Sequence, residues 1–386
     1  MFVAAHFSHH LMTALPVPLL PFIRDDFGLD YRQSAWIISA FSLAYGFSQL
    51  PAGWLADRIS RSYVIAIGIL GVAMAGVLLG LSHTYVMTIL LLVLMGLLGG
   101  GYHPGATPWI SSAAGERSQG RALGFHFVGG GTGFFVAPIV ATAIAAAWGW
   151  HSSFLILAGP SAVFGLIFLL FLRQQTRSSR LLTVSAQEEI RPTAGKNRRR
   201  SLIALLVMSL IAGGFGSVMS FLALYLVDQF GVSKQVAGSL VAVSSFAGLW
   251  AGPLGGHLSD RIGRLPIIII CSLLGGLLTL SLKFVPYGIG LFAVLLLMGI
   301  NVYLSAPVSE AFIMGQTSQK NRSTIYGLYY LAGQGGALFA PLMGSLIDGL
   351  GFRTTAMIAG IAIAAVTAAS SYFLITGREK TSAQAS

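Results

Sequence analysis

The chain has 386 residues, of which 55% are apolar and only 9% are charged, and its formal net charge is +11. Soluble domains average roughly 25% charged residues, so this composition excludes a water-soluble globular protein. Cys271 is the only cysteine, which excludes an internal disulfide bond.

Apolar runs of about 20 residues recur along the whole chain, and this length matches the hydrocarbon core of a bilayer. Because backbone groups in lipid must be hydrogen-bonded within the segment, we expect helices. The alternating segments of a membrane barrel are absent from the sequence. The twelve predicted spans are 2–23, 32–54, 63–83, 86–112, 121–147, 152–172, 202–227, 235–257, 265–283, 288–314, 323–347 and 354–376. We interpret the first as a retained helix and not a signal peptide, since it lacks a cleavage-site pattern.

A polar segment with eight Lys or Arg separates the first six spans from the last six. We therefore predict an N-terminal six-helix bundle over 1–172 and a basic cytoplasmic linker over 173–200. A C-terminal six-helix bundle follows over 201–376, and a cytoplasmic tail over 377–386.

The loops on one side of the predicted spans hold 18 of the 23 Lys and Arg residues. By the positive-inside rule this side faces the cytoplasm, as do both termini. The net charge then requires no nucleic-acid partner, and the basic linker is expected to contact anionic lipid headgroups. We expect a monomer in the bacterial inner membrane, with the lipid bilayer and a small-molecule substrate as partners.

A charged phrase after the second span is repeated after the eighth. Residues 53–61 read GWLADRISR and residues 256–264 read GHLSDRIGR, with six of nine positions identical. The same offset of 203 residues matches Asp25 to Asp228, Gly28 to Gly231, Pro104 to Pro307 and the segment 123–138 to 326–341. One ungapped offset over this length indicates two homologous halves of the same orientation. Parallel repeats of this kind place a substrate site between the halves, near the midplane.

Twelve spans, a basic central linker and the phrase G-x-L-A-D-R-x-x-R after span 2 resemble the major facilitator superfamily. HFSHHL near the start, YHPGA in span 4 and GFHFVGGGTG in span 5 are similar to the fosmidomycin-resistance-like branch of its drug-efflux carriers. The resemblance covers the whole chain. It implies an all-α integral membrane protein with 12 transmembrane helices in two pseudo-twofold six-helix bundles, and a pathway lined by spans 1, 4, 7 and 10.

The repeated phrase is the candidate gate. A carboxylate is favoured at a helix N-terminus, and small residues allow helices to approach closely in lipid. The resemblance implies a cytoplasmic latch that holds the halves together while the outer face is open. Its candidate residues are Gly53, Asp57, Arg58, Arg61, Glu116, Arg117, Asp260, Arg261 and Arg264. Alternatively the arginines only anchor loops, although positive-inside bias does not explain the aspartates.

Glu310 is the exception among the carboxylates because it lies within an apolar span. An intramembrane acid is costly and is a functional hypothesis by default. We interpret Glu310 as a proton carrier in the pathway. The alternative is a structural side chain that reaches the membrane interface.

Histidines gather in three of the spans. The pathway candidates are His6, His9 and His10 at i, i+3 and i+4 of span 1, His103 in span 4 and His126 in span 5, with Tyr102, Asn301 and Gln334 as further polar groups. Imidazole titrates near neutral pH, so the cluster can exchange protons or hydrogen-bond a polar solute. For His126 an interhelical hydrogen bond is the alternative. No nearby Cys or carboxylate completes a metal site, and we predict no metal.

These features predict a secondary active transporter that moves a small organic solute by alternating access, with proton-coupled export preferred. Uptake by proton symport and facilitated passage of a small metabolite stay open. We expect no enzymatic activity, because a lipid-modifying membrane enzyme needs a nucleophile or paired carboxylates and Glu310 stands alone. The sequence has no G-x-x-x-x-G-K loop, so we expect the proton gradient to supply the energy, without a cofactor.

Overall fold

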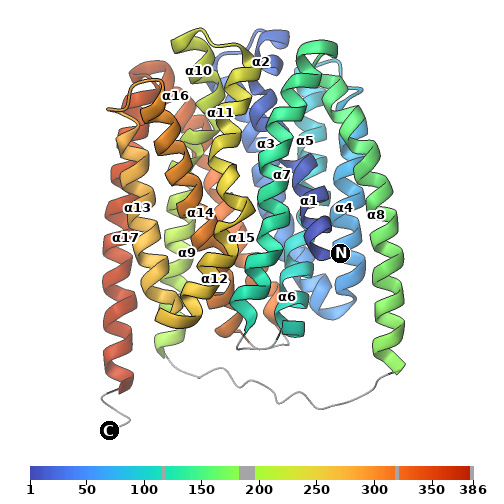
Figure 1. The fold of residues 1–386 in the computed structure, drawn as a ribbon, viewed down its shortest axis with the longest axis vertical. Coiled ribbons are helices and arrows are strands. Elements are labelled where there is room, and N and C mark those ends of the chain that lie inside the picture. The colour runs from blue at the N-terminus through green and yellow to red at the C-terminus, as the bar shows by residue number, and fades with distance from the viewer. Residues whose placement is uncertain (115–117, 182–195, 318–320, 383–386) are drawn as a thin grey trace.

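The computed structural model describes residues 1–114, 118–181, 196–317 and 321–382, and every regular element in these ranges is a helix. The helices run side by side along the long axis of the molecule (Figure 1). α2, α10 and α16 lie at the top of this view, and α6 and α12 lie towards the bottom. The prediction of an all-α fold is confirmed.

The predicted spans of the first half all fall on helices. They correspond to α1 (Phe2–Thr13) with α2 (Pro16–Phe27), α3 (Tyr31–Arg58), α4 (Arg61–Leu79), α5 (Tyr85–Gly99) with α6 (Tyr102–Ala114), α7 (Gln119–Trp148) and α8 (Trp150–Leu181).

The second half follows the same pattern with more interruptions. Its first span consists of α9 (Lys196–Gly216), η2 (Ser217–Phe221) and α10 (Leu222–Phe230), and its second of α11 (Lys234–Phe246), η3 (Ala247–Leu249) and α12 (Ala251–Ile262). The next two spans are single helices, α13 (Arg264–Ser281) and α14 (Ile289–Gly315). The fifth consists of α15 (Arg322–Gly335), η5 (Gly336–Phe339) and α16 (Ala340–Leu350), and the sixth is α17 (Phe352–Ser382).

Among the described residues, eight helices are long and apolar enough to cross a membrane, and the bent pair Lys234–Leu249 and Ala251–Ile262 makes a ninth. Three predicted spans fall outside this set: 2–23, 32–54 and 323–347. The first and last are divided by breaks, and α3 carries serines, glutamines and a proline that lower its hydropathy. α3 and α15 pack against each other, which explains why these helices can hold polar residues: much of their surface faces protein and not lipid.

Local sequence signals set several helix ends. Asp30 and Gln33 form a reciprocal capping box at the start of α3. Gly28 ends α2 with φ 65° and Gly231 ends α10 with φ 62°, a left-handed conformation that favours glycine. The repeat therefore preserves this turn in both halves.

The two halves meet along two equivalent seams. α3 packs along α15 and α16, and α7 packs along α11 and α12. The 203-residue offset carries α3 onto α11–α12 and α7 onto α15–α16, so the same packing occurs twice. This agrees with the pseudo-twofold arrangement. The predicted domain boundaries at residues 172 and 201 stay a prediction.

Glycine at the α7–α12 seam permits backbone contact between the halves. A Cβ at Gly124 would lie 2.7 Å from the Gly252 oxygen and 2.8 Å from Pro253 Cα. We therefore expect Gly124→Leu to destabilise the protein by about 1–3 kcal/mol through overpacking and to lower its thermal unfolding midpoint in detergent. Gly159→Leu is the matched control, because no atom lies within 4 Å of its Cβ position. Equal midpoints for the two variants would contradict close packing between the halves at Gly124.

Candidate functional site

A cavity of about 390 Å³ lies between the halves. The first half contributes His6, His10 and His103 to its wall, and the second contributes Tyr330 and Gln334. A neighbouring cavity of about 240 Å³ shares His10 and Gln334, and another of about 370 Å³ shares Tyr330 and Gln334. Volumes of this size accommodate small organic molecules.

Glu310 of α14 lines the 370 Å³ cavity, and its side chain is almost completely buried. Thr107 on α6 donates a hydrogen bond to Oε2 over 3.4 Å, and Tyr330 on α15 donates to Oε1 over 3.0 Å. Since α6 belongs to the first half and α15 to the second, the two carboxylate oxygens are held from opposite sides of the seam.

A chain of hydrogen bonds leads from this carboxylate into the first half. The Tyr330 hydroxyl lies 3.3 Å from His103 Nδ1. His103 Nε2 lies 3.3 Å from His10 Nε2, and His10 Nδ1 lies 3.0 Å from Thr13 Oγ1. A tyrosine hydroxyl has one hydrogen, so Tyr330 can donate to Glu310 or to His103 but not to both.

The three histidine side chains of span 1 lie in different surroundings. His6 and His10 line the cavity. His9 turns into the bundle, where Nδ1 donates to the Gly68 oxygen over 3.2 Å and Nε2 lies 2.9 Å from the Tyr45 hydroxyl. His126 lies behind His6, with the two rings stacked at a centroid distance of 4.1 Å. The shared helix face predicted for the trio is thus divided between the cavity and the interior.

The remaining pathway candidates occupy different places. Gln334 lines all three cavities. Tyr102 is buried, stacks on His9 and donates to the Phe2 oxygen over 3.3 Å. Asn301 donates to the Cys271 oxygen of α13 over 2.9 Å, an interhelical bond within the second half. Neither Tyr102 nor Asn301 is among the described residues that line these cavities.

Sequence reasoning missed Thr107 and Tyr330, the two residues that hold Glu310. The repeat contained a usable signal, because the 203-residue offset carries Thr107 onto Glu310. Residues related by a twofold axis can meet only near that axis. The hydrogen bond between this pair therefore places Glu310 close to the axis between the halves.

The first copy of the charged phrase joins the halves. The carboxylate of Asp57, on α3, accepts hydrogen bonds from Ser323 N (3.2 Å), Thr324 N (2.9 Å) and Thr324 Oγ1 (2.9 Å) at the start of α15. It also pairs with Arg61 at 3.7 Å. Asp57 thus caps a helix of the opposite half, where the helix dipole favours negative charge. Gly53 allows this approach, since a Cβ there would lie 2.8 Å from the Ser323 carbonyl carbon.

The second copy lies in the equivalent position. A Cβ at Gly120, near the start of α7, would lie 2.9 Å from Asp260 Oδ1. Arg264 donates to the Ala311 oxygen of α14 and, over 3.3 Å, to Gln119 Oε1 of α7. The second copy therefore also connects a helix start of one half with the charged phrase of the other. We call the two copies together the Asp57–Asp260 clasp.

Other gate candidates take no part in the contacts across the seam described above. Arg58 is exposed, and its guanidinium carbon lies 4.6 Å from the ring centroid of Trp54 on its own helix. Arg261 is exposed as well. Glu116 and Arg117 lie outside the residues that the structure describes.

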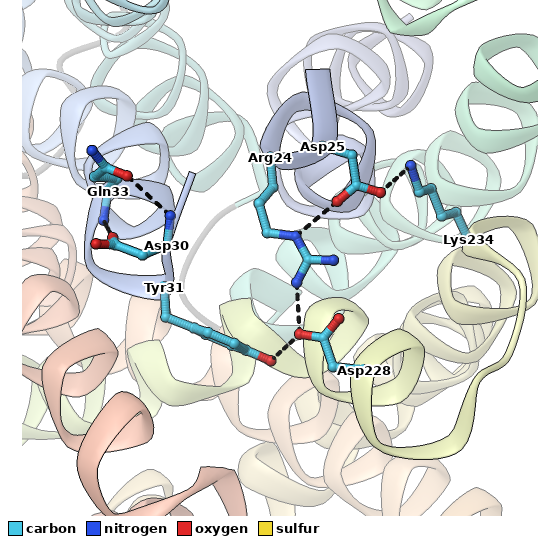
Figure 2. A network of polar contacts seen from close by, with 7 residues as sticks. All are labelled: Arg24, Asp25, Asp30, Tyr31, Gln33, Asp228 and Lys234. Carbon is cyan, nitrogen blue, oxygen red and sulfur yellow. Dashed lines mark hydrogen bonds and ion pairs between the residues drawn. The ribbon is translucent and has the colours of Figure 1, made fainter. Parts of the chain in front are cut away.

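A second set of contacts, which the sequence did not predict, joins the halves at the opposite end (Figure 2). Asp228 of α10 accepts hydrogen bonds from Arg24 Nη1 over 2.6 Å and from the Tyr31 hydroxyl over 2.7 Å. Asp25 pairs with Lys234 at 2.5 Å and with Arg24 at 3.0 Å. The offset relates Asp25 to Asp228 and Tyr31 to Lys234, so this network is also built from repeat-equivalent residues. We call it the Arg24–Asp228 network.

The cations of this network stabilise the ionised form of Asp25. Partial burial acts to raise the pKa of the Asp25 carboxyl, but its hydrogen bonds and charge interactions with Lys234 and Arg24 hold the pKa below the ordinary value. Asp25 therefore stays ionised at neutral pH. Both ends of the seam are connected in this conformation, by the clasp at one end and by the network at the other.

Comparison with known proteins gives consistent matches over both halves. The sequence profile of the Major Facilitator Superfamily matches residues 2–227 and residues 204–386. The multidrug resistance protein MdtG of Citrobacter koseri is 28% identical over 355 residues, which cover 88% of this chain and 86% of that protein. MdtG of Enterobacter lignolyticus is 28% identical over 367 residues, with 91% and 85% covered. MdtG of Salmonella typhi is 27% identical over 353 residues, with 88% and 86% covered.

Loss of the Asp57 cap should open the clasp end. We expect Asp57→Asn to speed labelling of Ser209→Cys, a position in the 370 Å³ cavity, by a membrane-impermeant maleimide in a Cys271→Ser background. Asparagine loses the negative charge that the helix dipole favours, which costs about 0.3–1 kcal/mol and corresponds to a change of about twofold to fivefold. Arg58→Ala is the control, because Arg58 stacks on its own helix. An unchanged labelling rate in Asp57→Asn would contradict a role for Asp57 in the gate.

Weakening the network should open the other end. We expect Asp228→Asn to speed maleimide labelling of Ser42→Cys, a position in the 240 Å³ cavity. The expected change is about twofold to fivefold, because partly exposed ion pairs contribute little free energy. Asp26→Asn is the matched control, since Asp26 accepts its hydrogen bond from Trp150 of the same half. Equal acceleration in both variants would show that the effect is not specific to the seam.

Proposed function

This chain belongs to the Major Facilitator Superfamily and is a multi-pass membrane transporter, not an enzyme, and we propose that it exports small organic solutes in exchange for protons. Glu310 carries this proposal. It is a buried carboxylate at the seam, bonded to Thr107 of one half and Tyr330 of the other.

Proton uptake by Glu310 would change the contact between the halves. The ionised carboxylate accepts hydrogen bonds from both Thr107 and Tyr330. The protonated group carries a hydrogen on one oxygen and must donate it, so one of these two partners has to rearrange. A ligand that binds two conformations differently shifts the equilibrium between them, and a proton on Glu310 meets this condition.

The titratable groups around Glu310 are mainly tyrosines. Tyr326, Tyr329 and Tyr330 of α15 surround it from one side, and Tyr45 of α3 lies nearby. These phenols can donate hydrogen bonds to the carboxylate without carrying charge at neutral pH. Glu310 is thus the carboxylate in this neighbourhood whose charge would change with proton uptake, and Tyr330 links it to the His103 imidazole.

The solute is proposed to bind in the 390 Å³ cavity. Aromatic rings and methionines line much of it, including Phe127, Phe134, Met219 and Met298. His10, His103 and Gln334 add hydrogen-bonding groups, and none of the described lining residues is Asp, Glu, Lys or Arg. Such a wall suits neutral or singly charged aromatic molecules. Methionine adapts to differently shaped ligands, which agrees with the multidrug resistance named for the MdtG relatives.

The two ends of the seam would alternate during transport. The clasp lies at the end where the Lys and Arg residues concentrate, and we place this end at the cytoplasm of a bacterial inner membrane, with both termini on the same side. Opening of the clasp would admit the solute from inside, and opening of the Arg24–Asp228 network would release it outside. A monomer suffices, because both halves of the pathway belong to one chain.

The test is proton-driven transport in proteoliposomes with Glu310→Gln beside the parent. The amide cannot exchange a proton, so we expect uphill movement of aromatic dyes, with ethidium as the first probe, to fall to the rate of protein-free liposomes. Dye-dependent proton flux, followed with a pH-sensitive fluorophore, should disappear as well. Asp348→Asn, which removes an exposed carboxylate, is the control and should pump like the parent.

Uphill pumping by Glu310→Gln at the parental rate would refute Glu310 as the proton carrier. Solute movement into the liposomes together with protons, in the parent, would reverse the assigned direction and support uptake.

A further inference from the structure

Three imidazole rings from two helices converge at the cavity wall. His6 and His10 come from α1 and His103 from α6, and one ring nitrogen from each lies within 4.8 Å of the others. All three side chains are at least nine-tenths buried, yet all three line the 390 Å³ cavity. Sequence reasoning grouped these histidines as pathway candidates but predicted no metal site.

The outer nitrogen of each ring is already engaged. His6 Nδ1 lies 2.8 Å from the His126 oxygen, His10 Nδ1 lies 3.0 Å from Thr13 Oγ1, and His103 Nδ1 lies 3.3 Å from the Tyr330 hydroxyl. A carbonyl oxygen only accepts, so His6 must carry its hydrogen on Nδ1 and keep a free lone pair on Nε2. Metal-binding histidines typically donate their second N–H in this way, which fixes the ring and its tautomer.

The inner nitrogens of His10 and His103 have the spacing of metal ligands. His10 Nε2 and His103 Nε2 are 3.3 Å apart. Two nitrogens that each lie about 2.0–2.1 Å from a tetrahedral ion are separated by about 3.3 Å. His6 Nε2 is buried and has no hydrogen-bond partner among the described residues. Without an ion, one nitrogen of the His10–His103 pair donates to the other, and His6 Nε2 remains unpaired.

The surroundings hold His6 in place. Its ring stacks on His126 at a centroid distance of 4.1 Å and on Tyr102 at 5.5 Å. On the α7 side the ring touches the backbone at Gly130, where a Cβ would lie 2.5 Å from Cε1 and 2.6 Å from Nε2. Glycine at this position is therefore what gives the ring its room.

We propose that His6, His10 and His103 bind one late first-row divalent metal ion, of the Zn²⁺ class, through their Nε2 atoms. Imidazole suits Zn²⁺, Ni²⁺ and Cu²⁺, whereas Mg²⁺ and Ca²⁺ prefer oxygen ligands. A three-histidine site leaves a fourth position, and here that position faces the cavity. Water or an electron-rich group of a solute would complete the coordination.

Hydrogen bonds connect this site to the Glu310 carboxylate. His103 Nδ1 reaches Tyr330, and Tyr330 donates to Glu310 Oε1 over 3.0 Å. A carboxylate that acts through a hydrogen-bonded ligand raises the basicity of that ligand. His9 cannot join the ligand set, because both its nitrogens are used by Gly68 and Tyr45.

The experiment measures metal binding directly, by equilibrium dialysis of tag-free, detergent-solubilised protein against Zn²⁺, with visible absorption of Co²⁺ as the probe of geometry. We expect the parent to bind one ion per chain and to give the spectrum of tetrahedral Co²⁺. His6→Ala and His103→Ala should weaken binding by more than about tenfold. His9→Ala, which removes a histidine from the same helix, should bind like the parent.

Gly130→Ala provides a test that keeps every histidine. Displacement of the His6 ring should weaken Zn²⁺ binding by about tenfold, while monodispersity and helical content stay those of the parent. The proposal is overturned if the parent binds no ion, or if His6→Ala and His103→Ala bind as tightly as His9→Ala. The readout needs no transport, so its failure would leave the proposed export untouched, and failure of export would leave the metal site untouched.

Discussion

A polar side chain inside a lipid-spanning helix must find its partner on another helix, because hydrocarbon offers none. The polar residues of this chain obey that constraint in two ways. Asn301 and His9 bond to helices of their own half, which ties each bundle together. Glu310 and Asp57 bond across the seam. The first kind of bond can persist throughout a transport cycle, whereas bonds of the second kind must break when the halves move apart at that end.

The repeat duplicates the contacts at the ends of the seam but not the side chains that line the cavities. The offset of 203 residues relates the two copies of the clasp and the two acids of the Arg24–Asp228 network. It carries His6, His10 and His103, however, onto Ser209, Gly213 and Ala306, which line the 370 Å³ cavity. Small residues in one half thus leave open the space that three imidazole rings fill in the other. The asymmetry of the cavities follows from these three pairs.

Sequence reasoning could place the helices because apolar length is a property of each segment alone. The resemblance to the major facilitator superfamily implied that the charged phrase holds the halves together, and the repeat marks both copies of the phrase. Sequence reasoning could not find that Asp57 caps α15, because that contact depends on which helix end lies opposite. The Arg24–Asp228 network was missed for the same reason, although Asp25 and Asp228 were already matched by the repeat. The breaks near Ala14 and Ser217 fall at equivalent positions, although prolines follow the first and glycines precede the second.

The position of Glu310 near the pseudo-twofold axis bears on how coupling would work. The two halves rock about an axis in the membrane plane, so groups at the ends of the seam move most. The clasp and the Arg24–Asp228 network lie at the ends, so they form and break in turn. Thr107 and Glu310 are repeat equivalents in contact across the seam, and the neighbouring Ala311 accepts a hydrogen bond from Arg264 of the clasp. We infer that the Thr107–Glu310 bond opens together with the clasp, and that protonation of Glu310 changes how strongly the halves are held at this end.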